Sequence, residues 1–277
     1  MIMLDRIVEK SPAKINLFLK IINKRKDGYH NIRTGVTLLN LCDEITAEKN
    51  SEFNIKYIGE FAPLENNFDD CIINKLFKFI NIKKPNYKFT IKKNIPIMSG
   101  LGSASSNAAA TLRILKKLKL FEINDIFQFN KIGSDIPLFI NQNDCLVRKK
   151  GDKIINQIFP KYYFLLIKPI FNSPTGLMYS KISIKNLNYK HEYDLDEINE
   201  HDSGNDFEKI IINESIEVKN ISKFLKNLDN AIFTGITGSG SCCFAAFENF
   251  KIAKINQKLF RESFPNLWSF VAENNSL

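Results

Sequence analysis

The sequence predicts a mixed α+β fold, because strand-like and helix-like segments follow one another without the regular β–α alternation of a doubly wound sheet. Segments that alternate polar and apolar residues, and short continuous apolar runs, predict strands. Segments with apolar residues three or four positions apart predict helices. The chain has 277 residues, 44% of them hydrophobic and 25% charged, which suits one large domain or two lobes with a sizeable core.

The first half of the chain is predicted to hold three strands and two helices. Ile7–Ile22 alternates polar and apolar residues, and Phe53–Tyr57 and Tyr87–Ile91 do so less regularly. Apolar residues at helical spacing predict helices over Asp70–Ile82 and Ser105–Leu120. The second of these helices begins with Ser and Asn residues that suit an N-cap, and it continues through three alanines.

The second half is predicted to open on a buried strand, the continuously apolar run Tyr162–Ile167. Periodicity is lost between Lys181 and Asp202, where we expect a loop or a variable surface. An apolar strand over Cys242–Phe247 and a helix around Ala253–Phe260 follow. No internal repeat of solenoid length is present in the sequence.

The net charge of +9 comes from 39 basic residues, of which only six are arginine. The lysines are scattered in short pairs such as Lys92–Lys93 and Lys116–Lys117, and they form no arm or stripe of the kind that binds nucleic acid. We therefore interpret them as solvated surface and expect no nucleic-acid partner. Five dispersed cysteines and three separate histidines lack zinc spacing, so no structural metal or disulfide framework is expected.

No apolar run approaches the ~20 residues that span a bilayer. The first residues show no basic-then-apolar signal region. The expectation is a soluble, cytoplasmic protein without a membrane partner.

The strongest functional pattern is the small-residue segment Pro96–Asn107, which leads directly into a predicted helix. Close backbone approach, several hydroxyls and a helix N-terminus together suit a polyphosphate. The segment is neither a Walker A loop nor a dinucleotide fingerprint, and taken alone it could be a turn before a capped helix. A second cluster, Thr237–Ser241, could be a plain bend. Since the chain has only 12 glycines, the two clusters together suggest two backbone surfaces that approach one ligand.

Three further segments carry candidate residues. Lys14 and Asn16 lie two apart in a predicted strand and so project to the same face, although a lysine there is usually only solvated. Asp27–Gly28 indicates a hairpin turn, and the adjoining Tyr29 and His30 suit a flat heterocycle. Asp135 is predicted in a short loop before an apolar strand, where a turn or capping role is the commoner one.

In this order, the segments resemble the motifs of the GHMP small-molecule kinases, the family of galactokinase, homoserine kinase, mevalonate kinase and phosphomevalonate kinase. The resemblance spans about residues 11 to 244 and rests on seven segments: Pro12–Leu17, Asp27–His30, Pro96–Asn107, Gly133–Phe139, Thr175–Tyr179, Gly204–Glu208 and Thr237–Ser241. The phosphate loop and the last glycine loop are shared across the family. Asp27–His30 and Gly204–Glu208 point to the branch whose acceptor is a cytidyl diphosphate.

The resemblance implies a two-lobed α+β kinase with its active site in the cleft between the lobes. An N-terminal lobe like ribosomal protein S5 domain 2 would cover residues 1–158, and a ferredoxin-like C-terminal lobe residues 159–277. It further implies that ATP, with Mg²⁺, phosphorylates the 2-hydroxyl of the methylerythritol part of a cytidyl diphosphate, in the non-mevalonate route to isoprenoid precursors. The oligomeric state is expected to be a monomer or homodimer, and no tightly bound cofactor is expected.

Carried over by position, the resemblance implies a role for each candidate residue. Asp135 would be the general base and Lys14 its cationic neighbour. The ATP phosphates would meet the loop formed by Pro96, Ile97, Met98, Ser99, Gly100, Leu101, Gly102, Ser103, Ala104, Ser105 and Ser106. The acceptor would meet Asn16, Tyr29, His30, Thr175, Tyr179, Gly238, Ser239 and Gly240, with Tyr29, His30 and Tyr179 flanking cytosine.

The chain departs from the family pattern at several positions. Met98, Ser99, Ser103 and Ala104 stand where glycine is common in relatives, and Leu138 replaces a Phe. Cys71 stands where relatives often have Asn, so adenine recognition there must rest on the backbone or on other groups.

Two alternatives stay open. Another GHMP kinase, of the homoserine or mevalonate type, would keep the glycine loops but has no evident need for Asp27–His30. A basic RNA-binding protein would need clustered cations with interleaved aromatic residues, and the lysine distribution does not show them.

Overall fold

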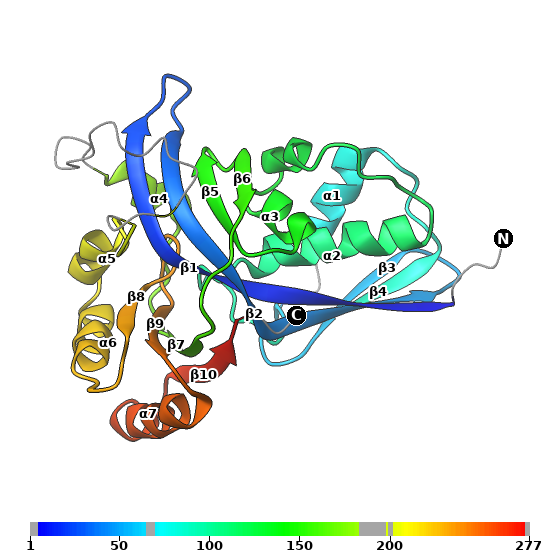
Figure 1. Cartoon of the computed structure of the whole chain (residues 1–277). Coiled ribbons are helices and arrows are strands. Elements are labelled where there is room, and N and C mark those ends of the chain that lie inside the picture. The colour runs from blue at the N-terminus through cyan, green and yellow to red at the C-terminus, as the bar shows by residue number, and fades with distance from the viewer. Residues whose placement is uncertain (1–4, 65–69, 183–197, 199–201, 275–277) are drawn as a thin grey trace. The chain divides into compact units, whose positions relative to one another are not determined.

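Two long strands, β1 (Arg6–Lys24) and β2 (His30–Lys49), pair with each other and contribute to both of the units into which the chain divides (Figure 1). The computed structural model describes residues 5–64, 70–182, 198 and 202–274. Unit 1 comprises Met1–Ala13, Leu41–Ile97 and Gly102–Gln142, and unit 2 comprises Lys14–Asn40, Met98–Leu101 and Asn143–Leu277. Each unit is assembled from three separate stretches of the chain and is not one continuous half of it. The lobe division into 1–158 and 159–277 stays a prediction.

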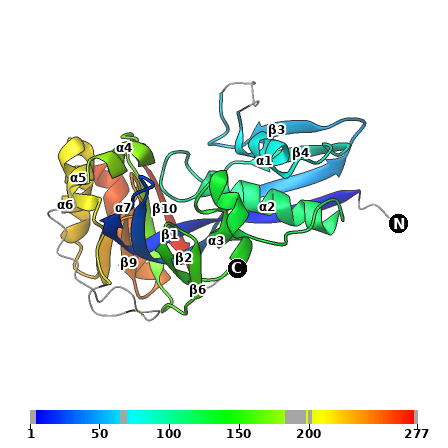
Figure 2. The ribbon, with the colours of Figure 1, turned by 90° about the horizontal axis from the view of Figure 1, so that it is seen from above.

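In unit 1 the end of β2 pairs antiparallel with β4 (Tyr87–Lys92), and β3 (Asn54–Ile58) joins β4 in parallel. Helices α1 (Ile72–Ile80) and α2 (Ser103–Lys117) pack beside these strands. Figure 2 shows α1 next to β3 and β4. The core consists of apolar side chains from β1, β2, β4, α1 and α2: Ile7, Ile45, Ala47, Ile73, Phe77, Tyr87, Phe89, Ile91, Ala110, Ile114, Leu115 and Leu118.

Helix α2 begins two residues earlier than the sequence predicts. Its N-cap is Gly102, whose φ of +78° lies in the left-handed region. Glycine has no side chain, so it supplies no capping oxygen. The Ser and Asn residues that resembled caps lie inside the helix instead. Glycine adopts this left-handed conformation without steric cost. The chain can therefore turn at Gly102 and begin the helix at Ser103.

The prediction of a strand after Asp135 is wrong. A short helix, α3 (Ile136–Asn141), follows the 3₁₀ helix η1 (Phe127–Lys131), and Asp135 occupies the N-cap position of α3. Pro137 stands in the first helical turn, where its missing N–H would have no intrahelical partner in any case. The continuous apolar run Ile136–Ile140 is short enough to suit a buried helical turn as well as a strand.

In unit 2 the beginning of β2 pairs with β5 (Cys145–Lys149), which pairs with β6 (Lys153–Asn156). A second sheet has the order β10-β7-β9-β8, formed by Trp268–Glu273, Tyr163–Lys168, Cys243–Phe247 and Phe233–Ile236, with every pairing antiparallel. Helices α5 (Glu208–Glu214), α6 (Ile216–Lys226) and α7 (Phe250–Ser263) cover the face that carries Leu165, Ile167, Ala245, Phe247 and Val271. A four-stranded antiparallel sheet with helices on one face fits the expected ferredoxin-like lobe, and α4 (Thr175–Ser180) precedes these helices.

The mixed α+β class is confirmed, and each predicted element except the strand after Asp135 coincides with an observed one. The loop expected between Lys181 and Asp202 falls almost wholly outside the described residues. Strands β2, β5, β6, β8 and β10 and helices α4 to α6 were not predicted. In the residues that the structure describes, no helix is both long enough and apolar enough to cross a membrane.

Candidate active site

Lys14 and Asn16 lie side by side on β1 in unit 2, on the same face of the strand as the sequence predicts. The Lys14 ammonium donates to Asn16 Oδ1 at 2.5 Å, and both residues are buried. Asn16 is held further by its Nδ2, which donates to Thr34 Oγ1 at 2.8 Å, and by its backbone N–H, which donates to Thr237 Oγ1 at 2.9 Å. The surrounding side chains thus fix the direction in which this lysine points. This interpretation replaces that of a solvated surface lysine.

The two glycine loops approach each other within unit 2. A Cβ atom at Gly100, which has φ +78°, would lie 2.7 Å from the carbonyl oxygen of Thr237 and 2.8 Å from that of Gly240. The N–H of Cys242 donates to the carbonyl of Ser99 at 3.0 Å. Gly238 lies against the same lysine, since a Cβ there would be 3.2 Å from Lys14 Nζ. Glycine is therefore required at Gly100 by contact as well as by dihedral angle.

Side chains from elsewhere in unit 2 hold the last glycine loop in place. Ser173 Oγ donates to the carbonyl of Ser239 at 2.5 Å, and Thr175 Oγ1 lies 2.8 Å from Ser239 Oγ. Asn205 donates twice through Nδ2, to the carbonyls of Ile236 at 2.6 Å and Gly238 at 2.7 Å. The predicted acceptor residues Thr175, Gly238 and Ser239 are thus brought together.

The tip of the β1–β2 hairpin and helix α4 bring aromatic rings together. The rings of His30 and Tyr179 stack with centroids 5.1 Å apart, and Tyr179 meets Phe207 edge to face at 4.9 Å. Burial, and secondarily the charge of Lys24, lowers the pKa of His30, which favours the neutral imidazole at neutral pH. Tyr29, by contrast, is 65% exposed. The hairpin turn at Asp27–Gly28 is confirmed.

The predicted phosphate loop runs through both units. Pro96 and Ile97 end one stretch of unit 1, Met98–Leu101 belong to unit 2, and Gly102 re-enters unit 1 as the N-cap of α2. Ile97, Met98 and Ala104 are exposed, whereas Pro96, Ser99, Leu101, Ser103 and Ser106 are buried. The first N–H groups of α2 have no partner inside the helix, which suits an anion.

The start of α2 and the segment that carries Asp135 lie together in unit 1. A Cβ at Gly133 would lie 2.9 Å from Ser105 Oγ, so the two segments are in direct contact. Asp135 is half-buried, and its carbonyl accepts from the N–H of Phe139 at 3.3 Å. Asp135 and Lys14 belong to different units, and their joint role stays a prediction.

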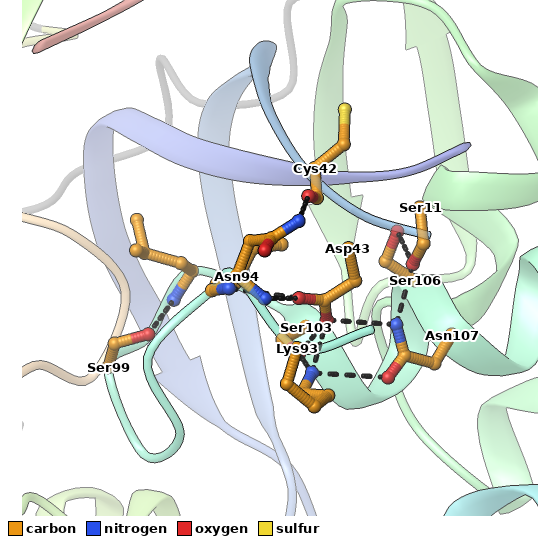
Figure 3. A network of polar contacts seen from close by, with 11 residues as sticks. Ser11, Cys42, Asp43, Lys93, Asn94, Ser99, Ser103, Ser106 and Asn107 are labelled. Carbon is orange, nitrogen blue, oxygen red and sulfur yellow. Dashed lines mark hydrogen bonds and ion pairs between the residues drawn. The ribbon is translucent and has the colours of Figure 1, made fainter. Parts of the chain in front are cut away.

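A buried polar network that was not predicted lies behind the start of α2 (Figure 3). Asp43 is fully buried, and its Oδ1 accepts from the N–H groups of Asn94 at 2.7 Å and Ile95 at 2.9 Å. Its Oδ2 accepts from the Lys93 ammonium, from Ser103 Oγ at 2.7 Å and from Asn107 Nδ2 at 3.0 Å. Both oxygens of this carboxylate are therefore fully engaged inside the protein.

The network also occupies two hydroxyls that the family resemblance assigned to ATP. Ser103 Oγ donates to Asp43, and the fully buried Ser106 Oγ accepts from Ser11 Oγ at 2.9 Å. The interpretation of Lys92–Lys93 as solvated surface is wrong for Lys93, which is 4% exposed, and holds for its neighbour. Successive side chains of a strand point to opposite faces, so one of two adjacent lysines at the end of β4 is expected to face inward. This alternation was the sequence signal for a buried lysine.

Cys71, at the position expected near adenine, caps helix α1. Its Sγ accepts from the N–H of Asn74 at 3.4 Å. Whether this region meets adenine stays a prediction. Among the residues that the structure describes, no three His, Cys, Asp or Glu side chains gather as a metal site.

Comparison with known proteins gives concordant matches. A family model described as the GHMP kinases N terminal domain matches residues 68–140. A curated protein of Buchnera aphidicola subsp. Acyrthosiphon pisum named 4-diphosphocytidyl-2-C-methyl-D-erythritol kinase is 33% identical, with 95% of this chain and 93% of that protein covered. One of the same name from Pelagibacter ubique is 35% identical, with 94% and 95% covered.

Solved structures show the same fold. A crystal structure of 4-(cytidine 5'-diphospho)-2C-methyl-D-erythritol kinase superposes with a TM-score of 0.79 at 22% identity, and 98% of this chain and 100% of that chain are covered. The mevalonate kinase of Methanococcus jannaschii superposes with a TM-score of 0.63 at 16% identity, with 97% and 98% covered.

Proposed function

Because the chain belongs to the 4-diphosphocytidyl-2-C-methyl-D-erythritol kinases of the GHMP kinase family, we propose that it transfers the γ-phosphoryl group of ATP to the 2-hydroxyl of that cytidyl diphosphate. The observation that supports this proposal most strongly is the 33–35% identity to kinases of this name over about 95% of the chain. This reaction places the enzyme in the non-mevalonate route to isoprenoid precursors.

The aromatic stack supports a cytidyl acceptor. His30 and Tyr179 present flat rings, and the neutral imidazole favoured by the lowered pKa of His30 can both donate and accept hydrogen bonds at a base edge. Tyr29, exposed next to His30, would supply a further aromatic ring for the same base. Asn16, Thr175, Gly238, Ser239 and Gly240 would place the rest of the acceptor, since Ser239 joins Thr175 and Gly238 adjoins Lys14.

Phosphoryl transfer depends mainly on positioning and on charge stabilisation. We assign Asp135 as the general base for the acceptor hydroxyl and Lys14 as the cation that offsets charge during transfer. For the ATP phosphates we assign the backbone N–H groups of the loop from Gly100 to Ser105. At Ser103 the backbone would make this contact, because its hydroxyl already binds Asp43. Ser106 would contribute no donor, because its hydroxyl binds Ser11 and its N–H donates to the carbonyl of Gly102 at 3.0 Å.

Mg²⁺ would enter bound to the ATP phosphates. A magnesium ion keeps several waters and needs only one or two protein carboxylates beside the phosphate oxygens. Among the described residues no His, Cys, Asp or Glu cluster forms a dedicated metal site, so the phosphate oxygens and water would supply most of the ligands. When bound, the ion neutralises charge on the phosphate oxygens.

We further propose that the enzyme works in the cytoplasm as a monomer or homodimer, without a nucleic-acid or membrane partner. The dispersed lysines of the sequence support the first of these exclusions.

A phosphoryl-transfer assay with three acceptors tests the proposal. ATP and Mg²⁺ are supplied with 4-diphosphocytidyl-2-C-methyl-D-erythritol, with mevalonate or with homoserine, and ADP release is measured together with the mass of the product. We expect turnover of the cytidyl acceptor alone. Turnover of mevalonate or homoserine without turnover of the cytidyl compound would overturn the proposal in favour of another GHMP kinase.

A further inference from the structure

We propose that Lys93 is a positioning residue for ATP, which cancels the charge of the buried Asp43 carboxylate and so keeps the N-terminus of α2 able to attract the phosphates. The proposal rests on the proposed function, because it concerns the ATP site assigned there. Lys93 itself would not touch ATP, since it is 4% exposed and is directed at the inner side of the helix start (Figure 3).

The contacts of Lys93 join three segments of unit 1 at one point. Its ammonium donates to Asp43 Oδ2 on β2, to Ser103 Oγ at the first residue of α2, and to Asn107 Oδ1 one turn later at 3.2 Å. The backbone of Lys93 is fixed independently, because its N–H donates to the carbonyl of Ile58 at 2.7 Å. A side chain anchored at both ends sets where the first turn of α2 lies.

The network continues from α2 to β1. Asn107 Nδ2 donates to Ser11 Oγ at 2.7 Å as well as to Asp43, and Ser11 donates to Ser106. Three residues of the first turns of α2, Ser103, Ser106 and Asn107, are thereby held from inside. These side-chain contacts use none of the first backbone N–H groups of α2, which project from the N-terminal end of the helix.

Charge explains why a lysine is needed here and not only a packed side chain. The N-terminus of a helix carries about half a positive charge, which attracts anions. Without its cation, the buried Asp43 carboxylate beside Ser103 would itself interact with the positive end of the helix. It would also repel a second anion, and this repulsion is strongest where water does not screen the two charges. The Lys93 ammonium makes the pair neutral, so the attraction of the helix end remains available to the ATP phosphates.

Within the part of the chain that the structure describes, Asp43 also acts on a thiol and a phenol, and neither group can supply a cation in place of Lys93. Burial lowers the pKa of Lys93, and the Asp43 carboxylate opposes that shift. The neighbours influenced by Asp43 are Cys42 and Tyr57; burial raises the pKa of Cys42 to about 11 and raises the pKa of Tyr57 well above its usual value. Both are therefore uncharged near neutral pH.

The test measures equilibrium binding of a non-hydrolysable ATP analogue with Mg²⁺, together with kcat and the two KM values. In Lys93→Met the Asp43 carboxyl remains and loses its cationic partner. We expect the affinity for the analogue to fall about ten-fold or more, in line with one uncompensated charge near a helix end, while the KM of the acceptor changes less than about two-fold. Lys92→Met, one residue earlier and exposed, is the matched control and should bind like the wild type.

A second variant separates charge from folding. Asp43→Asn combined with Lys93→Met removes both charges and keeps an amide that can accept from the N–H groups of Asn94 and Ile95. We expect this double variant to bind the analogue within about three-fold of the wild type, although each network hydrogen bond it lacks lowers its melting temperature. Wild-type affinity in folded Lys93→Met, or no recovery in the folded double variant, would overturn the proposal.

The binding assay needs no acceptor. If the wild type binds the ATP analogue but does not phosphorylate the cytidyl compound, the proposed substrate is wrong and the comparison of Lys93 variants still stands.

Discussion

Gly100 is held between two carbonyl groups, and its backbone angle alone would already restrict it. A side chain there would meet the carbonyl oxygens of Thr237 and Gly240 at 2.7 and 2.8 Å, while φ is +78°. We expect Gly100→Ala to lower the free energy of unfolding by about 2–4 kcal/mol, since the left-handed conformation and the contact both cost energy. Urea unfolding followed by circular dichroism measures the change.

Gly176 supplies the matched control, because it stands in α4 with no positive φ, and a Cβ at this position would meet none of the described atoms within 4 Å. Gly176→Ala should leave the free energy of unfolding unchanged or raise it by up to about 1 kcal/mol. Equal stabilities of the two alanine variants would show that the two glycine loops do not pack as described.

Asp135 tests the assigned chemistry with the smallest change of shape. Asp135→Asn keeps the N-cap geometry of α3 but cannot accept the proton of the acceptor hydroxyl. We expect kcat to fall by a factor of about 10³ or more, in the range that general bases contribute, with binding of the ATP analogue within about three-fold of the wild type. Near-normal turnover in this variant would remove Asp135 from the role of base.

Among single residues, those with local signals were predictable from the sequence. Lys14 and Asn16 two apart in a strand, and glycines clustered in a glycine-poor chain, point to the places where the structure brings residues together. Asp43 and Lys93 are 50 positions apart, and their pairing depends on the β2–β4 register. A single sequence holds no signal for such a register, so a buried ion pair of this kind was not predictable.

At the scale of elements, helix α7 shows how local capping supports a core helix. Asn249 Oδ1 accepts from the N–H of Ile252 at 2.9 Å, and the helix buries Ala253 and Phe260 against the second sheet. We expect Asn249→Ala to cost about 1 kcal/mol of unfolding free energy, whereas Asn249→Ser, which keeps a capping oxygen, should cost only a few tenths. Equal losses in both variants would mean that the cap contributes nothing, and chemical denaturation resolves the difference.

Elements with clear periodicity or long apolar runs were predicted, and those with mixed patterns were not. Strand β2 is buried on both faces over much of its 20 residues, so alternation is lost in its sequence. Helix α3 has only six residues, with Pro137 in its first turn, and its apolar run reads equally well as a strand. In both segments, packing within the unit, and not the local sequence pattern, determines whether a strand or a helix forms.

At the scale of the whole molecule, a hydrophobic core cluster lies in each unit, and several arginines pair with carboxylates of the chain itself. Among the described residues, Arg6, Arg25, Arg33 and Arg113 pair with carboxylates, and the Arg33–Asp202 pair is fully buried. Arg261 donates to Ser269. The Arg6–Glu48 and Arg25–Asp27 pairs lie at the surface. Arginine binds phosphate best through two parallel hydrogen bonds, and a guanidinium that is already paired with a carboxylate has fewer donors left for that contact.

The net charge of +9 should therefore not produce nucleic-acid binding under physiological salt. We expect a fluorescent RNA or duplex DNA of about 30 nucleotides to bind no more tightly than about 10 μM at about 0.15 M salt, because dispersed lysines release few counterions per site. Any weak binding at low salt should be displaced by ATP with Mg²⁺ if it occurs at the phosphate loop. Fluorescence anisotropy over a salt series measures both. Submicromolar affinity that ATP does not displace, with a steep dependence on salt, would identify a separate basic surface that binds nucleic acid.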